Sequence, residues 1–312
     1  MSNSIKPTFS TALLHPKYWG VWLGFGFLAL FVNIMPYKVL LYIGRKIGEI
    51  GMRYGKKRVH VATRNLELSF PDMSKEEIDT IVVENFKNTG MALMETGITW
   101  FWPTWRFKRI LNVGDMTELN HFNENKKGVL LCCVHALNLE ITARAFTTFG
   151  LAGYGVYRPH ANPAYNLIQY WGRTHGGNRL IDRRDVKGMI RVLRKGERLF
   201  YLPDHDYGHN KSVFVPFFGV EEACTTTGPS ILAYPSKCEI VSGSGFRNKD
   251  GKYDILVDEA IKDYPQKDMT AGAALLNKSM EKVILRGLDQ WMWLHKRFKS
   301  MPDKNKSNER YL

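Results

Sequence analysis

A histidine and a glutamate five residues apart, His135 and Glu140, follow directly on an apolar run over residues 128–134. Such a run predicts a buried strand, and open α/β sheets bind ligands at the carboxyl ends of their strands. Positions five apart differ by roughly 140° around a helix axis, so the two side chains cannot share a helix face. We therefore expect His135 in the turn after the strand and Glu140 in the first or second turn of the next helix.

This arrangement predicts general-base chemistry. From the helix, the carboxylate of Glu140 would reach back to one ring nitrogen of His135, fix its tautomer and stabilise the imidazolium. The other ring nitrogen is then free to take a proton from an alcohol. Unpaired backbone N–H groups at the helix N-terminus would suit a developing oxyanion, as acyl transfer requires. The alternative is a buried histidine with no catalytic role, whose ring only forms a hydrogen bond with a neighbouring group.

Four further residues are candidates for substrate binding: Arg158, Arg183, Asp204 and Asp206. Arg158 ends a predicted strand, where a guanidinium suits a phosphate, although a solvated surface arginine is the alternative. Asp204 and Asp206 lie in a short loop with His205 and Gly208. That loop could hold a metal, contact substrate, order neighbouring residues, or be a turn held by its own side chains. We predict no metal site.

Apolar runs alternate with helical patterns from residue 128 onward, which predicts an α/β fold with a mostly parallel central sheet flanked by helices. Ser74 and Glu77 form a capping box that begins a long helix reaching about residue 98, and Asn162 caps a later one. The expected strands are 128–134, 151–157, 198–202, 213–217, 238–246 and 253–258, and the expected later helices are 137–149, 163–174, 186–194 and 270–287.

Residues 19–35 contain no ionisable side chain and have aromatic residues at both ends, as membrane-spanning helices do. Between Lys38 and Arg64 there are eight basic residues and one acidic residue. The positive-inside rule then leaves the large C-terminal part in the cytoplasm, with the chain crossing the membrane once. The alternative for residues 19–35 is a buried core helix. The tryptophans of residues 100–105 fit the membrane interface and the core equally well.

The 312 residues carry 44 Lys and Arg against 30 Asp and Glu, a net charge of +14 that predicts an anionic partner. The four cysteines have neither the spacing of a zinc site nor that of a redox Cys-x-x-Cys motif, so we expect reduced thiols. The adjacent residues Cys132 and Cys133 are predicted to be packing residues of a strand rather than a covalent acyl carrier. We divide the chain into an N-terminal segment with a transmembrane helix (1–36), a region of interfacial and amphipathic helices (37–110), an α/β core (111–300) and a loose polar tail (301–312).

The order of the His135, Arg158, 202–208 and 215–219 blocks resembles the four-block pattern of the glycerolipid acyltransferase superfamily. More closely, nearly the whole chain resembles the late acyltransferases of lipid A biosynthesis, the lauroyl and myristoyl transferases of the bacterial inner membrane. The stretches that carry this resemblance are residues 9–19, 64–71, 90–97, 100–103, 204–208 and 293–299.

The resemblance implies transfer of a fatty acyl chain, laurate or myristate, from acyl carrier protein to a hydroxyacyl chain of a Kdo-bearing lipid A precursor, lipid IVA. It implies His135 as general base with Glu140 as its orienting partner, where the wider superfamily usually has Asp. The basic residues, Arg183 among them, would then meet the phosphorylated glycolipid, the acidic carrier protein or anionic lipid, and no nucleic acid or cofactor is expected.

Three other functions are consistent with the residues. A membrane-anchored phospholipid acyltransferase would use the same base. An ester hydrolase would need a nucleophile or metal set, and the chain has no Gly-x-Ser-x-Gly motif. A non-enzymatic protein that binds anionic lipid would depend on the net charge, and His135 would be dispensable to it.

Overall fold

The computed structural model describes residues 6–113, 127–265 and 267–312. Within them a seven-stranded sheet has the order β1-β9-β8-β2-β5-β3-β4. All neighbouring strands are parallel except β8 and β9. The mostly parallel α/β sheet is therefore confirmed. Its strands are β1 (Leu111–Val113), β2 (Val129–Cys133), β3 (Tyr154–Tyr157), β4 (Arg179–Asp182), β5 (Arg198–Tyr201), β8 (Glu239–Arg247) and β9 (Tyr253–Val257).

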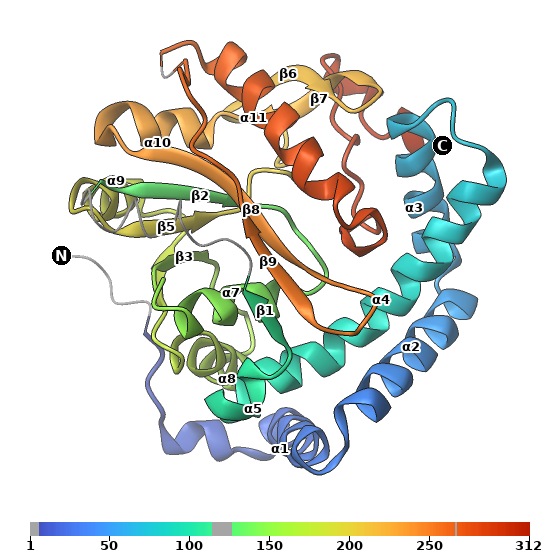
Figure 1. Ribbon diagram of the computed structural model, residues 1–312, viewed down its shortest axis with the longest axis vertical. Helices are drawn as coiled ribbons and strands as arrows, with labels where there is room; N and C mark the ends of the chain where they lie inside the picture. The colour runs from blue at the N-terminus through green and yellow to red at the C-terminus, as the bar shows by residue number, and fades with distance from the viewer. Residues whose placement is uncertain (1–5, 114–126, 266) are drawn as a thin grey trace.

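Helices cover both faces of this sheet (Figure 1). The α-helices are α1 (Trp19–Ile34), α2 (Tyr37–Tyr54), α3 (Lys56–Ser69), α4 (Lys75–Phe101), α5 (Thr104–Lys108), α7 (Leu139–Thr148), α8 (Pro163–Thr174), α9 (Val186–Arg194), α10 (Gly228–Ser236) and α11 (Met269–Leu285). The capping box at Ser74 and the Asn162 cap are both formed. Successive side chains of β2 point to opposite faces. Leu130 and Cys132 join the core beneath α9, α10 and α11, whereas Leu131 and Cys133 join the core beneath α1, α4 and α7.

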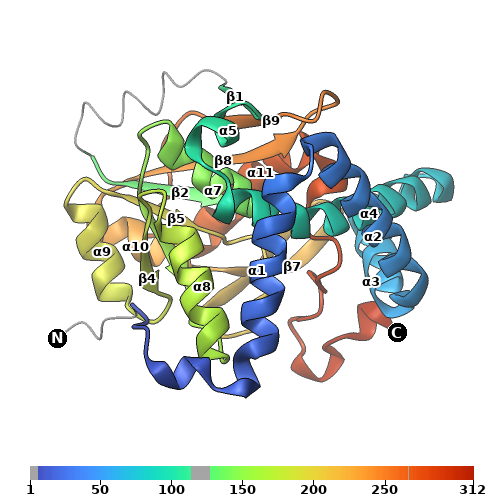
Figure 2. The ribbon, with the colours of Figure 1, turned by 90° about the horizontal axis from the view of Figure 1, so that it is seen from below.

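Helix α1 lies along the outside of the domain beside α8 (Figure 2). Its Val32 is buried, and a Cβ on Gly97 of α4 would come within 2.8 Å of the Val32 side chain. The opposite face exposes large apolar side chains such as Leu23 and Phe27. The stretch Pro16–Ile34 is long and apolar enough to cross a membrane, which is weak evidence for an anchor. Trp100 and Trp102 are buried, whereas Trp105 is exposed.

Three strands differ from the sequence prediction. β1, β4 and β7 (Val220–Thr226) were not expected, because β1 is short and the other two carry charged residues. β6 (Ser212–Phe217) and β7 form a separate antiparallel hairpin rather than part of the main sheet. The expectation of a loose tail after residue 300 is wrong: Tyr311 is buried, and its hydroxyl donates a hydrogen bond to Asn65.

Candidate active site

Four of the residues singled out in the sequence follow the carboxyl ends of adjacent parallel strands. His135 follows β2, Asp204 follows β5, Arg158 follows β3, and Arg183 follows β4. This is the edge at which open α/β sheets bind ligands. His135 lies between β2 and α7, so the prediction that it belongs to the turn is confirmed. The sheet thus brings one histidine, one carboxylate and two guanidinium groups to the same edge.

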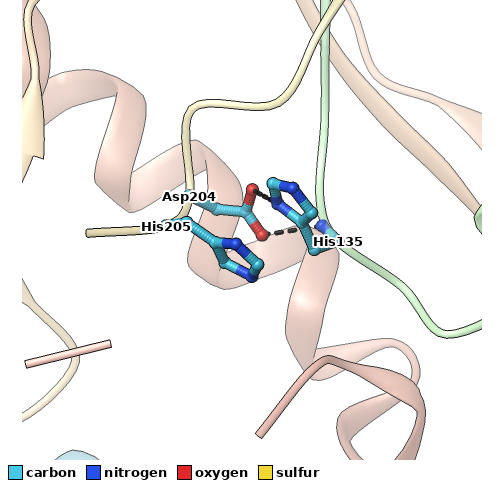
Figure 3. A group of neighbouring side chains, drawn as sticks. All are labelled: His135, Asp204 and His205. Carbon is cyan, nitrogen blue, oxygen red and sulfur yellow. Dashed lines mark hydrogen bonds and ion pairs between the residues drawn. The ribbon is translucent and has the colours of Figure 1, made fainter. Parts of the chain in front are cut away.

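Asp204 is the carboxylate that holds His135. Its Oδ1 lies 2.6 Å from Nδ1 of His135, and its Oδ2 accepts from the His135 backbone N–H at 2.7 Å (Figure 3). The same Oδ2 accepts a 2.7 Å hydrogen bond from the indole N–H of Trp291. A carboxylate can only accept, so the Nδ1 atom of neutral His135 carries the proton. The second ring nitrogen, Nε2, points away from Asp204 and is free to act as a base.

Asp204 remains ionised although it is fully buried. Burial alone would raise the pKa of its carboxyl group. The His135 imidazole, its hydrogen bond, and the His205 and Trp291 side chains outweigh burial and hold that pKa well below its usual range. An ionised carboxylate beside an imidazole nitrogen is the arrangement that orients a histidine base and stabilises its charged form.

Glu140 does not occupy the place that was expected of it. It is in the first turn of α7, and its Oε1 accepts hydrogen bonds from Nε and Nη2 of Arg173 on α8, at 2.8 and 2.5 Å. Its Oε2 accepts from the indole N–H of Trp100 on α4 at 3.0 Å. Burial lowers the pKa of Arg173, but the Glu140 carboxylate raises it by more, so the net pKa is raised and the Arg173 guanidinium is charged. Because α7 turns this side chain toward α4 and α8, the orienting contact to His135 comes from Asp204 instead.

A cavity of about 520 Å³ opens beside His135. Arg158, Arg183 and Lys211 are its cationic lining residues, and Tyr201, Tyr207, Asn210 and Thr226 add polar groups. The remaining side chains that line it, apart from His135 and Tyr157, are apolar: Val156, Val186, Met189, Leu202, Ile231 and Leu232. A cavity of this size with an apolar wall and a few cationic groups suits an amphiphilic anionic ligand. Arg158 and Arg183, two of the candidates for substrate binding from the sequence, both line this cavity.

Asp206 has a different place from the one expected. Its buried carboxylate accepts from the backbone N–H and hydroxyl of Ser300, at 2.7 and 2.9 Å, and from the Gly208 N–H at 2.8 Å. These bonds tie the loop to the chain near residue 300, and Asp206 is not among the residues that line the cavity. The loop at Asp206 is therefore ordered by its side chains.

His135, Asp204 and His205 bring three ligand atoms within 4.8 Å of one another, so a shared metal ion must be considered. The two imidazole rings are stacked, with centroids 3.4 Å apart and planes inclined by only 7°. Imidazole lone pairs lie in the ring plane, and nearly parallel planes do not meet at one ion. These residues do not fit a metal centre. Cys133 does not fit a nucleophile either, because burial raises the pKa of its thiol to about 12.

The sequence did not predict that residues 290–295 contact the turn that carries His135, although residues 293–299 are one of the stretches that carry the family resemblance. The Leu137 N–H donates to the Gln290 carbonyl at 2.7 Å, and the Met292 N–H donates to the His135 carbonyl at 3.0 Å. Asparagines on two helices hold this segment in turn: Asn85 of α4 donates to the Trp291 carbonyl, and Asn65 of α3 donates to the Trp293 and His295 carbonyls. Asn65 and residues 293–295 both lie in stretches that carried the family resemblance, and this was the available signal.

Comparisons with known proteins find similarity over nearly the whole chain. The family model for bacterial lipid A biosynthesis acyltransferases matches residues 6–300. The lipid A biosynthesis lauroyltransferase of Escherichia coli is 46% identical over 95% of this chain and 97% of its own length. A lipid A biosynthesis acyltransferase of Haemophilus influenzae is 41% identical over 97% of each chain. The E. coli lipid A biosynthesis palmitoleoyltransferase is 37% identical over 94% of this chain and 95% of its own length.

Proposed function

The chain belongs to the bacterial lipid A biosynthesis acyltransferases, and we propose that it transfers a fatty acyl group from acyl carrier protein to a hydroxyacyl chain of Kdo-bearing lipid IVA. Laurate is the proposed acyl group, because the 46% identical relative is named a lauroyltransferase; myristate is the second candidate. The observation that carries the catalytic part is the His135–Asp204 pair, whose histidine lines the cavity.

His135 is the proposed general base. As the acceptor hydroxyl attacks the thioester carbonyl, Nε2 takes the hydroxyl proton and Asp204 stabilises the imidazolium. The tetrahedral intermediate then collapses, the carbon–sulfur bond breaks, and the imidazolium returns the proton to the thiolate. A thioester is already activated, so no metal, cofactor or covalent enzyme intermediate is needed.

Asp204 takes the orienting role that the family resemblance implied for Glu140. Glu140 instead holds the start of α7 through Arg173 and Trp100, and the His135 turn leads directly into that helix. The helix N-terminus next to His135 also places a partial positive charge near the developing oxyanion. The original assignment, with Glu140 as the orienting carboxylate, is the alternative that mutagenesis must separate from this one.

Arg158 and Arg183 are proposed to bind a phosphate group of the substrate. Both side chains are exposed and line the cavity next to His135. Guanidinium groups form bidentate, charge-assisted hydrogen bonds with phosphate oxygens. The apolar wall formed by Val186, Met189 and Ile231 suits a hydrocarbon chain.

The protein is proposed to work at the cytoplasmic side of the bacterial inner membrane, anchored once through α1. The exposed apolar face of α1 and the basic residues of α2 and α3 support contact with anionic lipid. A single crossing predicts that a cysteine placed at Ser10 reacts with a membrane-impermeant thiol reagent added from the periplasmic side. Protection of that cysteine, with labelling only after lysis, would contradict the crossing.

One experiment tests the reaction. The purified protein is incubated with Kdo-bearing lipid IVA and an equimolar mixture of acyl carrier protein thioesters, and the products are identified by mass spectrometry. We expect the mass of one added lauroyl chain, and loss of the product with His135→Ala. Product formation by that variant at the normal rate would refute the mechanism. Free fatty acid without acylated lipid would indicate the hydrolase alternative.

A further inference from the structure

Three histidine rings form a continuous stack at the proposed active site. The centroids of His135 and His205 are 3.4 Å apart with planes inclined by 7°, and those of His205 and His295 are 4.1 Å apart with planes inclined by 13°. The three residues come from the β2–α7 turn, the loop after β5 and the segment after Trp293. Figure 3 shows the His205 ring against the face of His135, while Asp204 contacts its edge.

The other two rings of the stack, those of His205 and His295, are uncharged at neutral pH. Burial, together with the His135 and His295 rings and Arg297, lowers the pKa of His205 to about 2, and the Asp204 carboxylate opposes this only in part. Burial and the nearby Lys299, His135 and Arg297 charges also lower the pKa of His295, against the opposing Asp206 carboxylate. When His135 is charged, its ring therefore stacks against the uncharged ring of His205.

The stack constrains a motion that Asp204 leaves open. The hydrogen bond from Nδ1 to Oδ1 fixes one point on the edge of the imidazole, but the ring can still tilt about that point. A flat neighbour in van der Waals contact with one face removes this freedom. The buried Nε2 atoms of His205 and His295 have no hydrogen-bond partner among the described residues. A buried nitrogen without a hydrogen-bond partner destabilises the fold, so the His205 and His295 rings lie here at a cost in stability.

We propose that His205, backed by His295, is a positioning residue that holds the plane of His135 so that Nε2 faces the cavity. This inference rests on the proposed function only in taking His135 as the base. His205 is not among the residues that line the cavity, so it acts through His135 and leaves substrate binding unchanged.

The test compares His205→Ala, His205→Phe and, as a matched control, His175→Phe, an exposed histidine at the end of α8. We expect His205→Ala to lower kcat roughly 10- to 100-fold with KM for both substrates unchanged, since small misplacements of a catalytic group cost about this much. The planar phenyl ring should restore most of the loss, and the control should behave as wild type.

A spectroscopic measurement separates this proposal from failure of the proposed function. Ring-labelled ¹⁵N NMR reports the state of the His135 ring without any turnover. Both proteins should show a protonated Nδ1 and an unprotonated Nε2, because Asp204 fixes the tautomer, but the signals should be sharp in wild type and broadened in His205→Ala, where the ring can tilt. An unchanged His135 signal in His205→Ala would overturn the proposal. So would a phenyl variant that is as slow as the alanine variant while its His135 signals are as sharp as in wild type, because His205 would then act chemically itself.

If the His205 variants do not fold, His295→Ala gives the second test. It removes only the backing ring, from a half-buried position, and should lower kcat several-fold with a smaller broadening of the His135 signals. Full turnover together with an unchanged spectrum would refute a positioning role for the stack.

Discussion

Replacing Asp204 with Asn is the sharpest test of the catalytic pair. Asp204 accepts three hydrogen bonds: two at Oδ2, from the His135 backbone and Trp291, and one at Oδ1, from Nδ1 of His135. Asparagine has one acceptor oxygen and one NH₂ group, which can only donate. No orientation of the amide can therefore reproduce all three bonds.

The favoured orientation follows from counting these bonds. With its oxygen at the Oδ2 position, the introduced amide keeps two of the three, and its NH₂ group faces Nδ1 of His135. Nδ1 must then accept, so the proton moves to Nε2 and the base is lost. The reverse orientation sets the NH₂ group against two buried donors, at a cost of about 1–3 kcal/mol for each unpaired group. The variant should thus fold with His135 in the wrong tautomer.

The expected loss in kcat is roughly 10³- to 10⁴-fold, or about 4–5.5 kcal/mol in the activation barrier, as in other histidine–carboxylate pairs that lose the tautomer-fixing group. Steady-state rates with a fixed acyl carrier protein thioester would measure it, with the melting temperature as a check on folding. Turnover within threefold of wild type would refute the assignment of Asp204.

Glu140→Gln is the matched comparison. It breaks the ion pair with Arg173 at a partly exposed site, so we expect a loss of about 1–3 kcal/mol in the free energy of unfolding. The turnover of the folded protein should fall much less than in Asp204→Asn. If the glutamine variant is stable and has the larger loss in kcat, Glu140 is the orienting carboxylate after all.

Three further predictions follow from other parts of the molecule. Arg158→Ala and Arg183→Ala should each raise KM for the phosphorylated substrate roughly tenfold or more, since one charge-assisted contact is worth about 1.5–3 kcal/mol. The control Arg184→Ala removes an exposed ion pair with Asp182 and should leave KM unchanged. Equal KM values in all three variants would contradict phosphate binding. Burial lowers the pKa of His205 to about 2, below the 6.5 of an unfolded histidine, so the unfolded chain binds more protons than the folded chain between these pH values. The folded protein should therefore be fully stable with respect to this residue above about pH 6.5 and should lose about 2 kcal/mol in the free energy of unfolding by pH 5. Denaturant titrations should show a flatter pH dependence of that free energy in His205→Phe. Gly97→Val should push α1 away from α4, because even a Cβ at position 97 comes within 2.8 Å of the Val32 side chain. Faster proteolysis near residues 10–36 would show that α1 has separated from α4. Unchanged cleavage would mean that the contact between the two helices can adjust.

The sequence predicted the elements with strong periodicity and missed those without it. α8 and α9 begin and end at the predicted residues, since each has an asparagine or aspartate cap and a clear apolar face. β4 was missed because arginine and aspartate occupy its ends at the edge of the sheet, where no second neighbour demands an apolar surface. The tail was misjudged because polar composition suggested disorder, while the single buried Tyr311 anchors it.

The candidate site shows where local reasoning fails and what would correct it. Glu140 was chosen because it is near His135 in the sequence, whereas Asp204 is 69 residues away. In the parallel pair β2 and β5, Val129 lies opposite Arg198 and Cys132 opposite Tyr201, an offset of 69 residues in both cases.

The same offset, continued past the ends of both strands, sets His135 opposite Asp204. The strand register therefore sets the proposed catalytic pair, and knowledge that β2 and β5 are paired in this register would have been enough to predict the contact. A deletion of one residue in β5 that preserves pairing should shift Asp204 out of reach and abolish turnover, while a deletion in the β6–β7 turn, outside this sheet, should not. Retained activity in the first variant would show that the register does not set the pair.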